Sequence, residues 1–151
     1  MHRFTDCGSM NDFFYEVCTR IHGHVAILGL AVLLHPILSL STQQKLRKGT
    51  KWSIWLSMLF VLCAYMMGLW LYPEYRSEIK PRLIADHIAM AYMFERKEHL
   101  AFLCCFSVLG GGILSLFVEG SQARTIARLL LWWGWVCGLL VAGMGILVAS
   151  A

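Results

Sequence analysis

Five of the six histidines in this 151-residue chain lie in or beside hydrophobic stretches. His22, His24 and His35 fall along the first stretch, and His87 and His99 precede the third. Imidazole is unfavourable in a lipid environment, so an intramembrane histidine is usually retained for a function. In small helical membrane proteins that function is often ligation of a haem iron or another metal, or a part in a proton or quinone site.

Two of these histidines would share one face of a helix. If residues 21–40 are helical, His24 and His35 differ by about 20° around the axis and by roughly 16 Å along it. This stacking resembles the paired histidines of di-haem cytochrome b subunits; the similarity is architectural and extends to no family motif. A six-coordinate haem needs a second axial ligand at matching depth. His99 opens the third stretch at the depth of His24, so we predict these two as axial ligands of a haem b.

Four further residues extend this predicted site. His22 and His87 are substitute ligands near the same interface, and Arg20 and Arg96 could meet the haem propionates. His35 has no histidine partner at its own depth, so one haem is better supported than two. A second haem would need a ligand from another chain. The predicted function is therefore a b-type haem-binding membrane subunit that transfers electrons. Quinol oxidation is one reaction to which it could be coupled. A redox carrier or complex subunit is expected rather than a stand-alone enzyme.

Two other interpretations stay open. The first is a non-haem transition-metal site formed by Glu95, Glu98 and His99 with His22 or His24, since these ligand types suit iron, zinc or copper. The Glu-x-x-His pattern of di-iron bundles is absent, however, because the position three residues after Glu95 is Glu98 and His99 comes one position later. There is also no His-Glu-x-x-His motif. The second is a non-catalytic accessory or scaffold subunit without a cofactor, in which the histidines are structural.

The composition predicts the elements that must hold these residues. The chain is 58% hydrophobic with a mean hydropathy of +0.63, which excludes an ordinary soluble domain. Four stretches have about the 20 residues that cross a bilayer; they cover residues 21–40, 52–72, 100–118 and 129–151. We predict an all-α, integral membrane four-helix bundle forming one domain over residues 1–151. The polar segment 73–98 is predicted to form an interfacial helix, started by Pro81, or to extend the third span out of the membrane.

Charge distribution suggests an orientation and excludes one class of partner. The predicted 41–51 loop and the loop before the fourth span hold six of the 13 basic residues and one of the nine acidic residues. The dense basic cluster in the 41–51 loop favours a cytoplasmic position for that loop, with both termini exterior or periplasmic. No basic stripe indicates nucleic acid. The expected surroundings are the lipid bilayer, with other membrane subunits or further copies of the chain as partners, and quinone as a candidate small molecule.

Small residues recur at four-residue spacing in the third and fourth stretches. Such rows let helix backbones approach closely in lipid. The rows are Ser107, Gly111 and Ser115 in the third stretch, and Gly134, Gly138 and Ala142 in the fourth. Packing within one chain is the favoured interpretation, and a docking face for a second subunit is the alternative.

Overall fold

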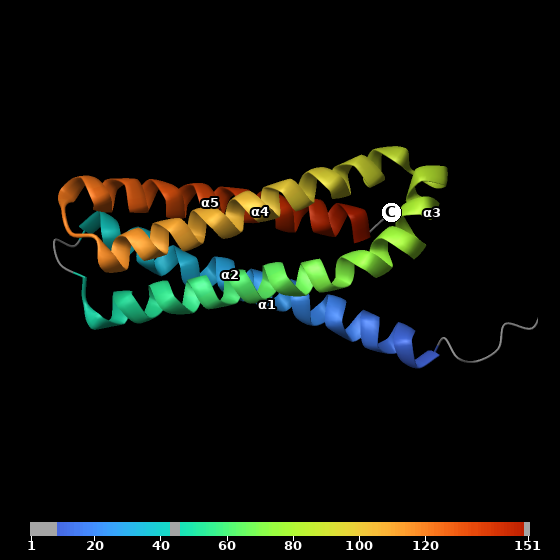
Figure 1. Ribbon diagram of the computed structural model, residues 1–151, viewed down its shortest axis with the longest axis horizontal. Helices are drawn as coiled ribbons and strands as arrows, with labels where there is room; N and C mark the ends of the chain where they lie inside the picture. Colours follow the sequence, from blue (N-terminus) through green and yellow to red (C-terminus); the bar gives the residue numbers. More distant parts are fainter. Residues whose placement is uncertain (1–8, 43–45, 150–151) are drawn as a thin grey trace, which may run out of the picture.

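The computed structural model describes residues 9–42 and 46–149, and these residues are almost entirely helical (Figure 1). The N-terminal tail, the centre of the 41–51 loop and the last two residues of the predicted fourth span lie outside them. In chain order the elements are α1 (Ser9–Thr42), α2 (Lys48–Glu74), the π-helical turn η1 (Tyr75–Ile79), α3 (Lys80–Asp86), α4 (Ile88–Phe117) and α5 (Ser121–Ala149).

Four helical segments among the described residues are long and apolar enough to cross a membrane. They are Phe13–Leu40, Lys48–Asp86, Ile88–Phe117 and Ser121–Val148. A helix suits this environment because it satisfies its own backbone hydrogen bonds where no water is available. The prediction of an all-α, multi-pass membrane protein is confirmed.

The helices are longer than the predicted spans at the polar end. α1 begins at Ser9 rather than near residue 21, and α4 begins at Ile88 rather than near residue 100. In α1 the extension includes an ion pair of 2.5 Å between Glu16 and Arg20, which are four residues apart and therefore share a helix face. Hydropathy finds only the part of a helix that lies in lipid, so it misses polar turns that continue beyond it.

The predicted polar segment 73–98 is nearly all helix. α2 continues through Pro73, and α3 follows the turn η1 directly, with Pro81 in its first turn as expected. The break falls at His87, whose φ of −145° and ψ of 64° are not helical. A short helix, α3, therefore precedes α4, which itself begins well before residue 100.

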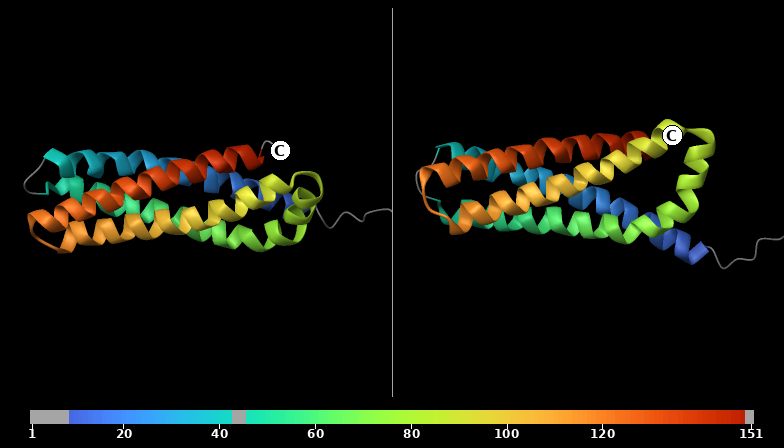
Figure 2. Two further views of the ribbon diagram at one scale, coloured as in Figure 1. Left: turned by 90° about the horizontal axis from the view of Figure 1, so that it is seen from above. Right: turned by 45° about the horizontal axis from the view of Figure 1, so that its top comes forward.

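Two helical hairpins form the bundle. α1 packs mainly on α2, and α4 on α5; contacts of α1 with α5 and of α2 with α4 join the hairpins. α1 and α4 are thus diagonal rather than adjacent. At one end lie residues 46–51 and 117–121, which we call the loop end (Figure 1). At the other, the terminus end, α1 begins, α5 ends, and α3 bridges α2 and α4 (Figure 2).

The small residues of α4 and α5 are packed against helices of the same chain. A Cβ atom at Gly111 of α4 would lie 2.9 Å from the carbonyl oxygen of Ala127 in α5. A Cβ at Gly134 of α5 would lie 2.7 Å from Cγ2 of Val108. The two helices therefore approach more closely than side chains would allow. This geometry is the predicted packing within one chain.

Candidate functional site

The histidine pair that the sequence stacks on α1 lies on the outside of the bundle. His24 and His35 are both exposed, whereas Leu33 and Ile37 on the same helix are fully buried. The face that carries the two histidines is therefore turned away from the interior of the bundle. In a membrane this outer face meets lipid or a neighbouring protein. The structure brings no second predicted ligand to either ring from within the described residues.

His99 is exposed on α4, and His87 is exposed at the break before α4. Nδ1 of His99 lies 2.8 Å from the carbonyl oxygen of Glu95, and Nδ1 of His24 lies 2.7 Å from that of Arg20. A ring nitrogen facing a carbonyl oxygen is the donor of the neutral ring, which leaves the Nε2 lone pair available. Metal-bound histidines usually have this arrangement. The donor chemistry of both rings therefore fits an iron ligand, although α1 and α4 are not neighbours.

His22 is the histidine that turns toward the bundle. A Cβ at Gly68 of α2 would lie 3.4 Å from His22 Cε1 and 3.9 Å from Nε2, so the ring lies against α2 at a glycine. The backbone of Ala64, one turn before Gly68, lies close to the ring. Nδ1 is buried and has no hydrogen-bond partner among the described residues. In the tautomer protonated at Nε2, Nδ1 is an acceptor.

A second buried polar atom without a described partner is the hydroxyl oxygen of Tyr75. Tyr75 is only 4% exposed, and its ring stacks on that of Phe94 in α4 with centroids 3.4 Å apart and planes 12° apart. Buried polar groups are nearly always hydrogen-bonded, so two such atoms at one end of the molecule require an explanation. A water or a bound polar molecule at each atom would supply the missing partner.

Charged groups of α4 act electrostatically on these two side chains. Lys97 lies within electrostatic range of the His22 ring, and Glu98 within range of Tyr75. The ammonium group of Lys97 is 4.2 Å from the centroid of the Phe94 ring. We call these residues the polar cluster: His22, Tyr75, Phe94, Lys97 and Glu98. It combines an acceptor, a hydroxyl, an apolar ring and one charge of each sign.

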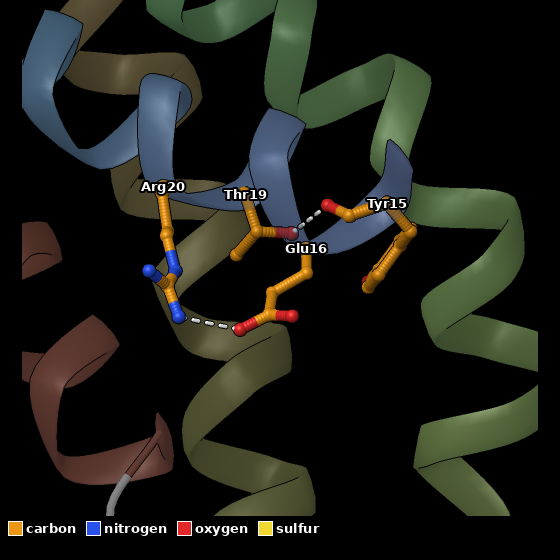
Figure 3. Close-up of polar contacts among 4 residues, drawn as sticks. All are labelled: Tyr15, Glu16, Thr19 and Arg20. Carbon is orange, nitrogen blue, oxygen red and sulfur yellow. Dashed lines mark hydrogen bonds and ion pairs between the residues drawn. The ribbon is translucent and has the colours of Figure 1, made fainter. Parts of the chain in front are cut away.

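The arginines predicted for haem propionates differ from each other. Arg20 is paired with Glu16 at 2.5 Å on the exposed side of α1, on the same turn as a bond of 2.9 Å from the Thr19 hydroxyl to the Tyr15 carbonyl (Figure 3). Arg96 is exposed on α4. Arg20 would have to leave an existing partner in order to bind a propionate, whereas Arg96 is exposed on the helix that carries His99.

The carboxylates considered for a non-haem metal do not gather into a ligand set. Within residues 9–42 and 46–149, no group of three or more His, Cys, Asp or Glu side chains is placed to hold a metal ion. Glu95 instead accepts a hydrogen bond of 2.5 Å from Lys80 and ties α3 to α4. The geometry thus adds no support to that interpretation.

The sequence does not point to Tyr75, and it points to Glu98 only as a candidate ligand of a non-haem metal. A usable signal existed for Glu98, because it precedes the buried Cys105 by seven residues and so shares its helix face. The same spacing relates His22 to Gly29, which is also buried. Tyr75 had no comparable signal, since it lies in a π-helical turn whose periodicity differs from that of α2.

Comparison of the chain with protein families, curated proteins and solved structures finds no match.

Proposed function

We propose that this protein is a membrane electron-transfer subunit that oxidises a quinol at its terminus end, with haem b as its redox group. The observation that supports this most is the pair of buried, unpartnered atoms in the polar cluster, His22 Nδ1 and the Tyr75 hydroxyl. Leaving such atoms without partners is unfavourable, by about 1–3 kcal/mol each. A ligand that bonds both recovers that free energy.

A quinol headgroup has the matching chemistry. It carries two hydroxyl groups on opposite edges of an apolar ring. His22 Nδ1 accepts a hydrogen bond from one hydroxyl, and the Tyr75 hydroxyl bonds the other. Phe94, held against Tyr75, offers an apolar wall. The long apolar tail of a quinol would extend between the lipid-facing helices.

The cluster also offers acceptors for the protons. Oxidation of a quinol to a quinone releases two electrons and two protons. His22 Nδ1 takes one proton and the Glu98 carboxylate takes the other, and both pass to water at the terminus end. Lys97, the sequence neighbour of Glu98, places a positive charge beside these two proton acceptors. Haem b, when bound, supplies a one-electron acceptor for the two electrons in turn.

His24 and His99 are the proposed haem ligands, since both rings leave Nε2 free. Because both rings are exposed on diagonal helices, His24 of one copy of the chain and His99 of a second copy would hold one haem between them, on the outside of each bundle. Arg96 is then the better candidate for a propionate. The basic loop end faces the cytoplasm and the terminus end the exterior.

An optical spectrum tests the haem. Protein purified from haem-replete cells should show a Soret band, with sharp α and β bands after reduction by dithionite. Replacing His24 or His99 by Leu should abolish the low-spin spectrum. A folded, colourless preparation would reject haem binding, and a low-spin spectrum retained in both variants would reject this ligand pair.

Binding of a quinone analogue tests the polar cluster independently of haem. His22→Leu and Tyr75→Phe should each weaken binding about tenfold, the effect of losing one hydrogen bond of about 1.4 kcal/mol. Tyr92→Phe is the matched control, because Tyr92 is 57% exposed on α4 and outside the cluster. Equal affinity of all three variants and the wild type would reject the site.

The accessory or scaffold alternative loses one of its supports. Its proposed docking faces were the rows of small residues, and Gly111 and Gly134 are covered by Ala127 and Val108 of the same chain. The exposed apolar side chains that remain are those that any lipid-facing helix presents.

A further inference from the structure

A surface hollow lies at the loop end, away from the polar cluster. It has a volume of about 380 Å³ and is lined by Lys48, Lys51, Trp52 and Trp55. These residues are spaced by three, one and three positions along the first two turns of α2, so they form one continuous stripe of the helix. All four side chains are exposed, and Trp52 is 77% exposed.

The apolar side of the hollow is held by packing. The ring of Trp55 meets that of Phe117, the last residue of α4, edge to face at a centroid distance of 6.4 Å. Phe117 belongs to the other hairpin, so this contact fixes one wall of the hollow at the junction of the two hairpins. Tryptophan rings at a helix end are typical of the headgroup level of a bilayer, where the ring is apolar and its N–H is polar.

The charged side of the hollow favours an anion. No acidic residue lies in the first turn of α2, and Arg47, which precedes the helix, makes no side-chain cap. The first-turn amides therefore add positive potential to that of the two lysines. At the same end, α5 adds two further basic residues, Arg124 and Arg128, against one described acidic residue, Glu119.

We propose that this hollow binds the headgroup of an anionic phospholipid. Lys48 and Lys51 contact the phosphate, while Trp52 and Trp55 lie against the glycerol and the first carbons of the acyl chains. The volume is within the range of small-ligand sites and suits a phosphoglycerol group. The occupant is a lipid rather than a free phosphate, because half of the lining is aromatic and the stripe continues onto the lipid-facing side of α2.

Lipid retention tests this site. Purified protein is equilibrated in micelles containing equal amounts of phosphatidylglycerol and phosphatidylcholine, and bound lipid is measured by native mass spectrometry. The wild type should retain phosphatidylglycerol preferentially. Lys48→Gln combined with Lys51→Gln should lower its affinity roughly 25-fold, from about fivefold for each lysine. Lys48→Arg combined with Lys51→Arg keeps the charge and should keep the lipid.

Arg76→Gln combined with Arg82→Gln is the matched control, since it removes the same charge from exposed positions at the terminus end. This variant should retain the lipid as the wild type does. Equal loss in the control would mean that net charge alone attracts the lipid, and would overturn the proposal. Undiminished retention by the glutamine pair, or displacement of the lipid by inorganic phosphate at equal concentration, would overturn it as well.

Discussion

At the scale of single residues, Trp135 shows how a polar contact can join two membrane helices. Its indole N–H donates a hydrogen bond of 3.2 Å to the carbonyl oxygen of Leu30, linking α5 to α1. Trp135 is half-buried, whereas its neighbour Trp133 is 57% exposed. Tryptophans near a helix end are commonly interfacial anchors. Only Trp133 has the exposure of one.

Replacing Trp135 by Phe should lower the free energy of unfolding by about 0.6 kcal/mol, the average for a hydrogen bond between membrane helices. Thermal unfolding in detergent, followed by helical circular dichroism, would measure the change. Trp133→Phe is the control and should leave the midpoint unchanged. A larger loss in Trp133→Phe than in Trp135→Phe would contradict the role of the hydrogen bond.

At the scale of elements, the contact between α4 and α5 depends on which glycine faces the partner helix. A Cβ at Gly111 would lie 2.9 Å from a backbone oxygen of α5, closer than a carbon atom can approach. A Cβ at the adjacent Gly110 would meet Leu130 Cδ1 at 3.9 Å, an ordinary contact. Backbone cannot rotate away as a side chain can, so a methyl group at Gly111 must push the helices apart.

Gly111→Ala should therefore destabilise the protein by about 1–3 kcal/mol, despite the better helix propensity of alanine. Gly110→Ala has the same gain in propensity without the clash, and should be neutral or stabilising by up to about 1 kcal/mol. Unfolding of the two variants side by side in one detergent gives the comparison. Similar stability of both variants would contradict the close approach of the α4 and α5 backbones at Gly111.

The elements could be predicted from composition, whereas the inward faces could not. The four spans follow from long apolar stretches, and the shared face of His24 and His35 follows from helix geometry. The inward face is different, because the interior of the bundle and the lipid outside are both apolar. Periodicity then does not distinguish them, and His22 and His24, two residues apart and on opposite sides, could not be ranked correctly for burial.

At the scale of the whole molecule, exposure in the folded chain and exposure to water are different quantities. Cys63, in the middle of α2, is exposed, whereas Cys18, near the start of α1, is half-buried. A bilayer covers the middle of α2 and leaves the terminus end near water, since its apolar core is only about 30 Å thick. In a membrane, the half-buried thiol of Cys18 should thus react with a water-soluble reagent more readily than the exposed thiol of Cys63.

A membrane-impermeant maleimide should label Cys18 and leave Cys63 unmodified. The test uses two single-cysteine variants in vesicles, with all other cysteines replaced by alanine. Sealed vesicles of opposite orientation also determine the side on which Cys18 lies, and we expect the exterior. Labelling of Cys63 at the rate of Cys18 would contradict the position of α2 in the bilayer, and detergent-solubilised Cys63 provides the positive control.

The polar cluster lies wholly at the terminus end, and the other half of the bundle is filled with aliphatic and thiol side chains such as Leu33, Ile54, Val108 and Cys137. Of the described imidazoles and carboxylates in that half, His35 and Glu119 are both exposed and belong to neither the cluster nor this core. In the proposed reaction, the protons from His22 and Glu98 would therefore return to the side from which the electrons leave. By itself, such a subunit would perform no electrical work across the membrane, and its turnover would be insensitive to the membrane potential.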